Sequence, residues 1–427
     1  MFYMINIFKN DMKSITNDDL IRPGIIFMIG TISIAVLNYL YHIFMGRLLG
    51  PAEYGVLGSL FAIVYLTTFS SNTFNRVISK YAAEFKGKNK DGCMKRLITR
   101  GLYKISLYGL IVLFAYILLT PYIAKFMNLE DTAGLIIVGI IGYFSILGAV
   151  ITGALNGLQM FLWQNSLSFI SAVLKFGFAL LLVYLGFGVH GALIAIVIGV
   201  VVMLLVGAYS LKKEIIGVKS ENFKSKKIYL YAVPVFLSSI LPLLLITFDQ
   251  ILVKHYFSSV DAGYYAAAGN IAKIIWFGSG FFVSVLFPKV VKLNAQGKKA
   301  CKMLTKCLIY TSFLVLIGVG VYFTTPRLIV LAIYGSDYLP IASLVGMFGL
   351  ALGLYSITQV FIVYNLAVEK YKFLWILLFG FLLEIIGIVL FNSSLSEIIK
   401  ISLLTELFIL GMMLIYNRKE IFKNGSH

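Results

Sequence analysis

The stretch GRLLGPAEYG, residues 46–55, separates two apolar runs that are each long enough to cross a lipid bilayer. It holds one arginine, one glutamate, one proline and three glycines. Gly50 followed by Pro51 predicts a tight turn, because these two residue types favour the backbone angles of turns. Glu53 stands near the start of the second run, where the positive end of a helix dipole favours an anion. We therefore predict that one spanning helix ends at this stretch and a second begins.

The rest of the chain is as apolar as these two runs. Of its 427 residues, 60% are hydrophobic and 13% are charged, and the mean hydropathy is +0.94. Water-soluble domains carry about 25% charged residues, so that class is excluded. Unbroken apolar runs of about twenty residues favour helices over the alternating segments of a membrane β-barrel. We predict an all-α polytopic membrane protein with twelve transmembrane helices, at about 22–46, 54–79, 101–121, 133–157, 163–187, 189–210, 229–253, 262–287, 305–325, 339–366, 372–391 and 396–416.

The basic residues predict the orientation. When alternate connections are assigned to opposite sides, 28 of the 36 lysines and arginines fall on one side and five on the other. Basic loops stay cytoplasmic, so both termini are predicted to be cytoplasmic in a cell (plasma or inner) membrane. This bias also accounts for most of the net charge of +18, and nucleic-acid binding is therefore not expected. The first twenty residues lack the apolar core of a cleavable signal, so the first run is expected to be retained. The three cysteines, Cys93, Cys301 and Cys307, lie on or near the reducing side and are expected to be free thiols.

The second half of the chain repeats the first at an offset near 208 residues. PAEYGVLGSLFAIVYLTTF begins at Pro51, and SVDAGYYAAAGNIAKIIWF begins at Ser259. A second pair of matching segments is NGLQMFLW (156–163) and NLAVEKYKFLW (365–375). Six spans in each copy make the copies parallel. We predict an N-terminal lobe at 1–210, a basic cytoplasmic linker at 211–228, and a C-terminal lobe with a cytoplasmic tail at 229–427. Two lobes around a central cavity favour a transporter that works by alternating access.

Three stretches resemble a known family: GRLLGPAEYG, GALNGLQMFLW, and FDQILVKHYFSSVDAGYYAAAGNIAK. They are similar to the polysaccharide-transporter branch of the MOP (multidrug/oligosaccharidyl-lipid/polysaccharide) flippase superfamily, which includes the O-antigen repeat-unit flippases. The resemblance implies a V-shaped pair of six-helix bundles around a central cavity. It also implies translocation of a polyprenyl-pyrophosphate-linked oligosaccharide from the cytoplasmic to the outer leaflet. Lipid II flippases of the same superfamily usually carry two additional C-terminal spans, which are not expected for this protein.

Two other functions are weighed against this one. A cation-coupled multidrug exporter of the same superfamily is the alternative, but its cavity would be expected to hold acids and few buried lysines. A membrane enzyme is not expected, because such enzymes usually need a sizeable extracytoplasmic loop with catalytic groups, and we predict no catalytic residue. The four histidines show no ligand spacing, so no metal site or cofactor is predicted. The predicted partners are the lipid-linked oligosaccharide, membrane lipids and other polysaccharide-assembly proteins, and the chain is expected to act as a monomer.

Basic residues at membrane depth are the first candidates for binding the cargo. Lys273 lies about 18 Å along its helix from Asp261, near the midplane, and Asn270 is on the same face. Lys175 lies about as deep in the fifth span. Both lysines favour an anionic cargo such as a pyrophosphate, whose charge must cross hydrocarbon. The alternative is that each lysine pairs structurally with a buried glutamate.

Two arginines are weaker candidates. Arg76, with Asn72 one turn before it, lies on a polar stripe of the second span and near its cytoplasmic end. Arg47 lies at the outer end of the first span. For Arg76 the alternative is a side chain that extends to the lipid headgroups, and for Arg47 it is an interfacial anchor.

Three acids are predicted to couple transport to an ion: Asp249, Glu384 and Glu406. For Asp249 a pair with Lys254 is favoured over a cation or proton site. Pro234 and Pro242 interrupt the same span. Because proline frees backbone carbonyls and permits bending, this span is the predicted hinge.

Overall fold

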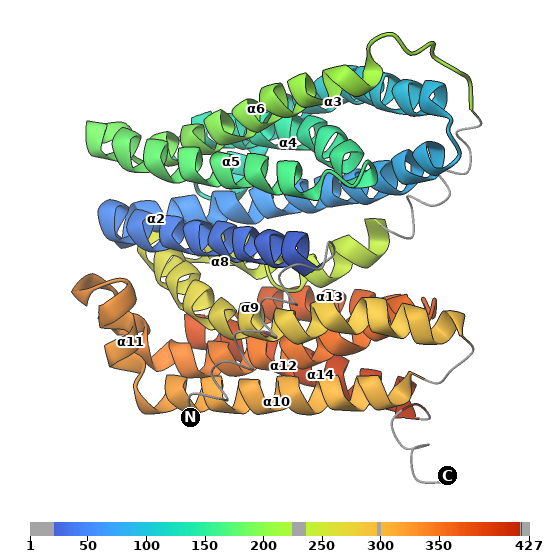
Figure 1. The fold of residues 1–427 in the computed structure, drawn as a ribbon. Coiled ribbons are helices and arrows are strands. Elements are labelled where there is room, and N and C mark those ends of the chain that lie inside the picture. Colours follow the sequence, from blue (N-terminus) through green and yellow to red (C-terminus); the bar gives the residue numbers. More distant parts are fainter. Residues whose placement is uncertain (1–20, 224–235, 297–299, 419, 421–427) are drawn as a thin grey trace, which may run out of the picture. The chain divides into compact units, whose positions relative to one another are not determined.

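The structure is a computed structural model that describes residues 21–223, 236–296, 300–418 and 420. Within these residues all regular elements are helices (Figure 1). The chain forms two compact units. Unit 1 holds the described parts of 1–42, 70–119 and 136–232, and unit 2 holds those of 43–69, 120–135 and 233–427. These units are groups of closely packed residues, and the lobe boundaries predicted from the repeat stay a prediction.

The helices follow one another through short connections. The first half of the chain forms α2 (Ile21–Gly87), α3 (Asp91–Phe126), α4 (Ala133–Gly157), α5 (Phe161–Leu182), the π-helical turn η1 (Val183–Phe187) and α6 (Gly188–Ile215). The second half forms a helical segment at 236–244, α8 (Phe248–Tyr256), α9 (Ser259–Ala295), α10 (Cys301–Thr324), α11 (Pro326–Ile333), the 3₁₀ turn η2 (Ser336–Ile341), α12 (Ala342–Ala367), α13 (Phe373–Leu390) and α14 (Leu395–Tyr416).

Ten helices in the described part of the chain are long and apolar enough to cross a membrane. Two of the ten are far longer than one crossing needs: residues 29–87 and 161–212. Each contains a break, at Gly50 in the first and at Gly186 in the second. The chain is thus a multi-pass membrane protein, while twelve crossings and the orientation of the termini stay predictions.

The break at Gly50 is the turn predicted from GRLLGPAEYG. Gly50 has φ 70° and ψ 175°, a conformation essentially open only to glycine, and Pro51 follows at the start of the next helix. Space around Gly50 is open, because nothing lies within 4 Å of the position of an added Cβ. The residue is therefore required by its backbone angles and by no side-chain contact.

Unit 1 is built on an apolar core that joins α3, α4, α5 and the later part of α2. The core includes Ala82, Met94, Ile98, Val150, Ala154 and Leu155, all fully or almost fully buried. Helices α5 and α6 pack closely, because Gly199 leaves room for the Ser171 carbonyl. The segment after α6 lies along the start of α3, where Glu221 N donates to Gly92 O (3.1 Å) and Lys95 Nζ donates to Val218 O (2.8 Å). The first half of the predicted linker is thus held to unit 1.

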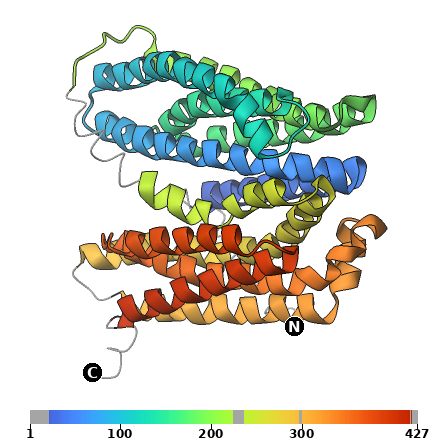
Figure 2. The same cartoon turned by 180° about the vertical axis from the view of Figure 1, so that it is seen from behind.

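Unit 2 is organised around α12, the span with the largest buried share. Helix α12 packs against α9, α10 and α14, and α14 packs in turn against α13 (Figure 2). Residues Phe361 and Phe373 are fully buried in the shared core. Helix α9 starts at a cap in which Ser258 Oγ accepts from Asp261 N (3.1 Å).

Two turns in different halves of the chain have the same geometry. Gln159 (φ 61°) and Glu369 (φ 57°) both adopt the left-handed conformation, and the following amides bond five residues back, Met160 N to Leu155 O and Lys370 N to Asn365 O, each at 2.9 Å. These are the NGLQMFLW and NLAVEKYKFLW segments. The turns at Asn89 (φ 54°) and Asn128 (φ 48°) have the same geometry, so it is a general helix ending and the internal repeat stays a prediction.

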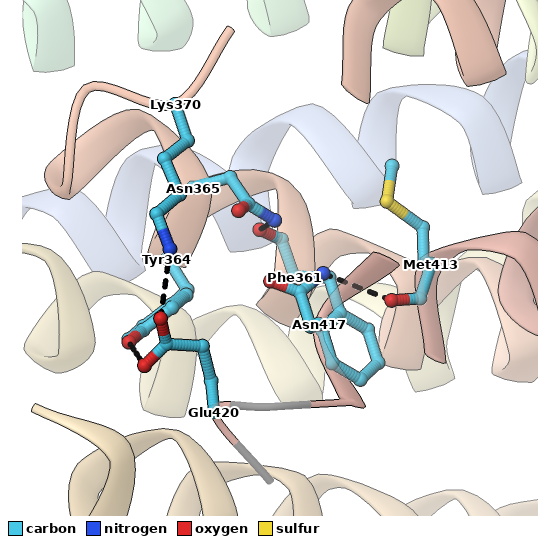
Figure 3. A network of polar contacts seen from close by, with 7 residues as sticks. All are labelled: Phe361, Tyr364, Asn365, Lys370, Met413, Asn417 and Glu420. Carbon is cyan, nitrogen blue, oxygen red and sulfur yellow. Dashed lines mark hydrogen bonds and ion pairs between the residues drawn. The ribbon is translucent and has the colours of Figure 1, made fainter. Parts of the chain in front are cut away.

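Glu420, the last described residue, contacts the turn at 368–372 and the helix before it. Glu420 accepts hydrogen bonds from Lys370 Nζ (2.7 Å) and Tyr364 Oη (3.1 Å) (Figure 3). The Asn417 amide closes the end of α14 on Met413 O (2.9 Å). This network fixes the end of α14 against the end of α12.

Candidate functional site

Lys273 lies in the middle of α9 and is half-buried. Its Nζ is 5.4 Å from the centroid of the Tyr65 ring, which comes from the helix that follows Gly50. Asp249 is the carboxylate whose charge acts on Lys273. A direct ion pair to Lys273 is not among the salt bridges of the described residues, and the ammonium makes a cation–π contact with the Tyr65 ring.

Asn270 lies one turn before Lys273 and is buried. Its Nδ2 donates to Tyr54 Oη (2.7 Å), and Tyr54 shares a second hydrogen bond with Tyr334 (3.1 Å). The prediction that Asn270 and Lys273 lie on one face agrees with these contacts, because both reach residues of 51–69. Asn270 is thus part of a tyrosine network on the same helix face as the lysine.

Lys175 occupies a comparable site in unit 1. Its Nζ donates to Asn38 Oδ1 and lies 4.6 Å from the centroid of the Tyr41 ring. Tyr41 is fully buried, and its hydroxyl donates to Ala192 O (2.9 Å), which fixes the ring. The contacts of Lys175 are an amide and a ring. The predicted alternative of a glutamate pair is not seen in the described residues.

The residues of the predicted polar stripe on the second span lie on two different faces of the helix. Asn75 Nδ2 donates to Thr152 Oγ1 (2.7 Å), and Asn156 Nδ2 donates to Asn75 Oδ1 (3.4 Å), so Asn75 serves packing against α4. Asn72 and Arg76 lie on the exposed side of the same helix. Their predicted substrate role stays a prediction.

Arg47 contacts backbone groups of α11. Its Nε donates to Ile333 O (2.8 Å), and its Nη2 donates to Ala332 O. A cation at the carboxyl end of a helix satisfies carbonyls that have no partner within the helix and matches the helix dipole. These contacts agree with the anchoring alternative for Arg47, and its predicted contact to a phosphate stays a prediction.

The three predicted coupling acids are all buried in unit 2, with exposed fractions of 7% for Asp249, 4% for Glu384 and 5% for Glu406. Their charges act on one another, Asp249 on Glu384 and Glu406 on Glu384, so the acids from α8, α13 and α14 form one group. Tyr265 Oη donates to Asp249 Oδ2 (2.6 Å), and the Gln250 amide donates to Oδ1 (2.8 Å). One oxygen of Glu406 is buried without a hydrogen-bond partner.

The favoured pair of Asp249 with Lys254 is absent from the described ion pairs. Lys254 is fully buried and donates to Asn128 O (3.0 Å), and the charge that acts on it is that of Glu130. Lys254 therefore serves the connection between α3 and α4, and Asp249 belongs to the acidic group instead.

The predicted hinge span is broken in the structure. The helical segment 236–244 gives way to a turn at 245–247 before α8 begins. At the break the Ile246 amide donates to Leu243 O (3.1 Å), and the carbonyl of Pro242 accepts from Tyr355 Oη (3.0 Å). Asp249 lies in the first turn of α8, just after the break. Pro234 lies outside the described residues.

Four tyrosines at these sites were not predicted: Tyr41, Tyr54, Tyr65 and Tyr265. Tyrosine is common in this chain, so residue type gave no signal. The repeat did carry one signal, because an offset of 208 places Tyr65 opposite Lys273.

The sequence and the fold were each compared with those of known proteins. The sequence profile of the polysaccharide biosynthesis protein family matches residues 20–294. A search of curated proteins found no matching sequence.

Solved structures with similar folds belong to transporters. A multidrug resistance MATE family transporter of the MOP superfamily, in an inward-facing conformation, is 14% identical with a TM-score of 0.73, covering 92% of this chain and 96% of the other. The lipid II flippase MurJ, in an inward closed conformation, is 19% identical with a TM-score of 0.73, covering 93% and 89%. A MOP superfamily transporter from Pyrococcus furiosus, described by a binding pocket of reverse polarity, is 16% identical with a TM-score of 0.60, covering 94% and 95%.

The profile covers more than half of the chain, and the fold is shared with a transporter and a lipid flippase. The chain belongs to the polysaccharide biosynthesis protein family, and it shares its fold with transporters of the MOP superfamily.

Proposed function

We propose that this protein is a flippase that moves a polyprenyl-pyrophosphate-linked oligosaccharide from the cytoplasmic to the outer leaflet by alternating access. Membership of the polysaccharide biosynthesis family supports a glycan cargo. The fold it shares with a lipid II flippase supports a lipid-linked one.

The observation that carries the proposal is the environment of Lys175 and Lys273. Each ammonium faces a tyrosine ring, and Lys175 also faces an amide oxygen. A lysine in an ion pair with a carboxylate has less charge to offer an anion. Neither lysine forms such a pair within the described residues, although the charge of Asp249 acts on Lys273. A pyrophosphate offers several oxygens to such donors, and charge-assisted hydrogen bonds to phosphate are among the strongest in proteins.

The alternative cargo, an organic cation, would need acids at the binding site. The buried acids of unit 2 form one group, and one of them, Asp249, accepts a hydrogen bond from Tyr265. We therefore assign Asp249, Glu384 and Glu406 to the coupling ion. A cation or proton at this group would relieve the repulsion among the carboxylates, and Glu406 has an oxygen free to bind it.

The break at 245–247 links the proposed ion site to the predicted hinge. We infer that the span containing Pro242 bends at this turn, because the backbone ladder is already interrupted there. Asp249 follows the break directly, so ion binding at Asp249 acts on the hinge.

Binding of pyrophosphate tests the cargo assignment. Purified protein in nanodiscs is titrated with a fluorescent short-chain polyprenyl pyrophosphate. Replacing Lys273 by alanine removes a hydrogen bond between charged groups, worth about 1.5–3 kcal/mol, so the affinity is expected to fall about 10- to 150-fold. Lys289→Ala, an exposed lysine on the same helix, is the matched control and is expected to bind like the wild type. Equal binding by wild type and Lys273→Ala, together with gradient-driven efflux of organic cations, would support the exporter instead.

Thermal unfolding tests the ion assignment without the cargo. A ligand that binds only the folded state raises the midpoint, so sodium ions or protons should stabilise the wild type in a concentration-dependent way. Asp249→Asn, Glu384→Gln and Glu406→Gln are each expected to remove that dependence. Glu369→Gln, an exposed acid in the turn after α12, is the control. Retention of the full ion effect in all three variants would refute the assignment.

A further inference from the structure

Two equivalent positions of the internal repeat meet each other in unit 2. Residues 51–69 and 259–277 correspond at an offset of 208, so Pro51 corresponds to Ser259 and Gly55 to Gly263. A Cβ added at Gly55 would overlap Ser259 O and lie 2.6 Å from Gly263 N. A Cβ added at Gly263 would overlap Pro51 O and lie 3.1 Å from Gly55 N. Each contact is the repeat partner of the other, so the two helices cross on a local two-fold axis.

The crossing depends on small residues. The Cα–H that stands in place of each Cβ points at the carbonyl oxygen of the opposite helix, a contact that recurs where helices approach closely. One turn further along, a Cβ at Gly58 would lie 2.7 Å from the Cβ of Ala266, again a pair of equivalent positions. At 55 and 263 only glycine fits without pushing the helices apart, and at 58 and 266 the pair is glycine and alanine.

The groups that face each other across the two helices become larger toward Lys273. The contact is between backbones at 55 and 263 and would be between methyl groups at 58 and 266. At 65 and 273 it is between a tyrosine ring and a long lysine side chain, 5.4 Å from centroid to nitrogen. Ten residues of helix separate Gly263 from Lys273, about 15 Å. While these helices touch, the space between Gly55 and Gly263 is closed to a group bound at Lys273.

Further contacts lie at the same end of the two helices as Gly55 and Gly263. Tyr338 Oη donates to Gly46 O (2.8 Å), and Arg47 binds the carbonyls at the end of α11. Tyr54 is fully buried and contacts the Tyr334 and Tyr338 rings. All these contacts join GRLLGPAEYG to residues 326–341, which lie away from the basic loops.

We propose that the crossing of Gly55 and Gly263 is the outer gate of the transport path, and that it opens by separation of the two helices. Backbone contact through glycine is close but has few atoms to disengage, which suits a contact that forms and breaks in every cycle. The gate rests on the proposed function only for the direction in which cargo leaves. Its closure and opening need no cargo.

Cysteine accessibility tests the gate. The three native cysteines are replaced by serine, and Ser59→Cys provides a nearly isosteric reporter that is fully buried one turn from Gly55. The protein is reconstituted in proteoliposomes and treated with a membrane-impermeant maleimide. Gly55→Ala and Gly263→Ala place a methyl group against backbone, so they are expected to hold the helices apart and raise the labelling rate at least tenfold. Gly280→Ala on α9, where an added Cβ meets open space, is expected to leave the rate unchanged.

A milder variant keeps the test valid if Gly55→Ala and Gly263→Ala fail to fold. Gly58→Ala presses one methyl group against another and is expected to raise labelling about threefold with normal gel filtration. Unchanged labelling in glycine variants that remain folded would overturn the proposal, as would equally fast labelling of the Ser59→Cys parent. If the glycine variants raise the labelling rate as expected but pyrophosphate does not bind, the proposed cargo is refuted and the gate stands. Normal pyrophosphate binding with unchanged labelling would refute the gate alone.

Discussion

Replacement of Lys175 by methionine separates a functional lysine from a structural one. Methionine keeps the length and most of the volume of the lysine stem but removes its charge. The wild-type ammonium makes a cation–π contact with Tyr41, worth about 2 kcal/mol when desolvated, and a charge-assisted hydrogen bond to Asn38, worth about 1.5–3 kcal/mol. Burial of an ion in a protein costs several kcal/mol. These values nearly cancel, and a methionine sulfur against the Tyr41 ring adds about 0.3–1.5 kcal/mol.

We therefore expect Lys175→Met to be as stable as the wild type or more stable by up to about 2 kcal/mol, while flipping activity is lost. Thermal unfolding in one detergent, followed by tryptophan fluorescence, measures the first effect. Exposure of a labelled polyprenyl-pyrophosphate sugar at the outer face of proteoliposomes measures the second. Lys289→Met, on an exposed face, is the control for the loss of a surface charge, with an expected change within about 0.5 kcal/mol. A loss of more than about 2 kcal/mol with activity retained would show that Lys175 is structural and would refute the reasoning.

Three other substitutions test separate features. Gly50→Ala should destabilise the protein by about 1–3 kcal/mol through backbone strain alone, whereas Gly177→Ala, in open space on α5, should stabilise it by about 0.5–1 kcal/mol; thermal unfolding compares the two. Tyr265→Phe removes the 2.6 Å hydrogen bond to Asp249 and should change the midpoint of the ion titration by at least tenfold, with Tyr264→Phe as the control. Glu420→Ala breaks a pair that is 46% and 32% exposed, so it should change stability by less than about 1 kcal/mol and leave transport unchanged; a larger loss would show that the end of α14 is held more firmly than its contacts indicate.

Much of the fold followed from local sequence signals. Helical spans are visible because the bilayer imposes runs of about twenty apolar residues. The break at Gly50 was predictable because Gly-Pro has few alternatives to a turn. Lys175, Lys273 and the three acids stood out because charge at membrane depth is rare.

The partners of these residues were not predictable. Arg47 binds the carbonyls of Ile333 and Ala332, and backbone carbonyls have no sequence signature. Lys254 was matched to Asp249 because the two are close in sequence, but its partner is the Asn128 carbonyl on another connection. The faces of Tyr41 and Tyr65 carry no formal charge, so no pattern of charges identified them. Tertiary packing decided each of these contacts.

The local two-fold axis explains why the repeat is preserved at some positions and lost at others. Near the axis, each residue faces its own equivalent from the other copy. Backbone packing favours the same solution on both sides, so 55 and 263 are both glycine, and 58 and 266 are both small. Charge disfavours identical residues at equivalent positions, because two lysines facing each other about 5 Å apart would repel by about 3 kcal/mol at an effective dielectric constant of 20. A cation on the axis must therefore face a different residue, and Tyr65 opposite Lys273 is such a pair. Symmetry at the crossing and asymmetry at the lysine thus follow from one geometry, in which the crossing must close tightly and the site below it must hold one positive charge.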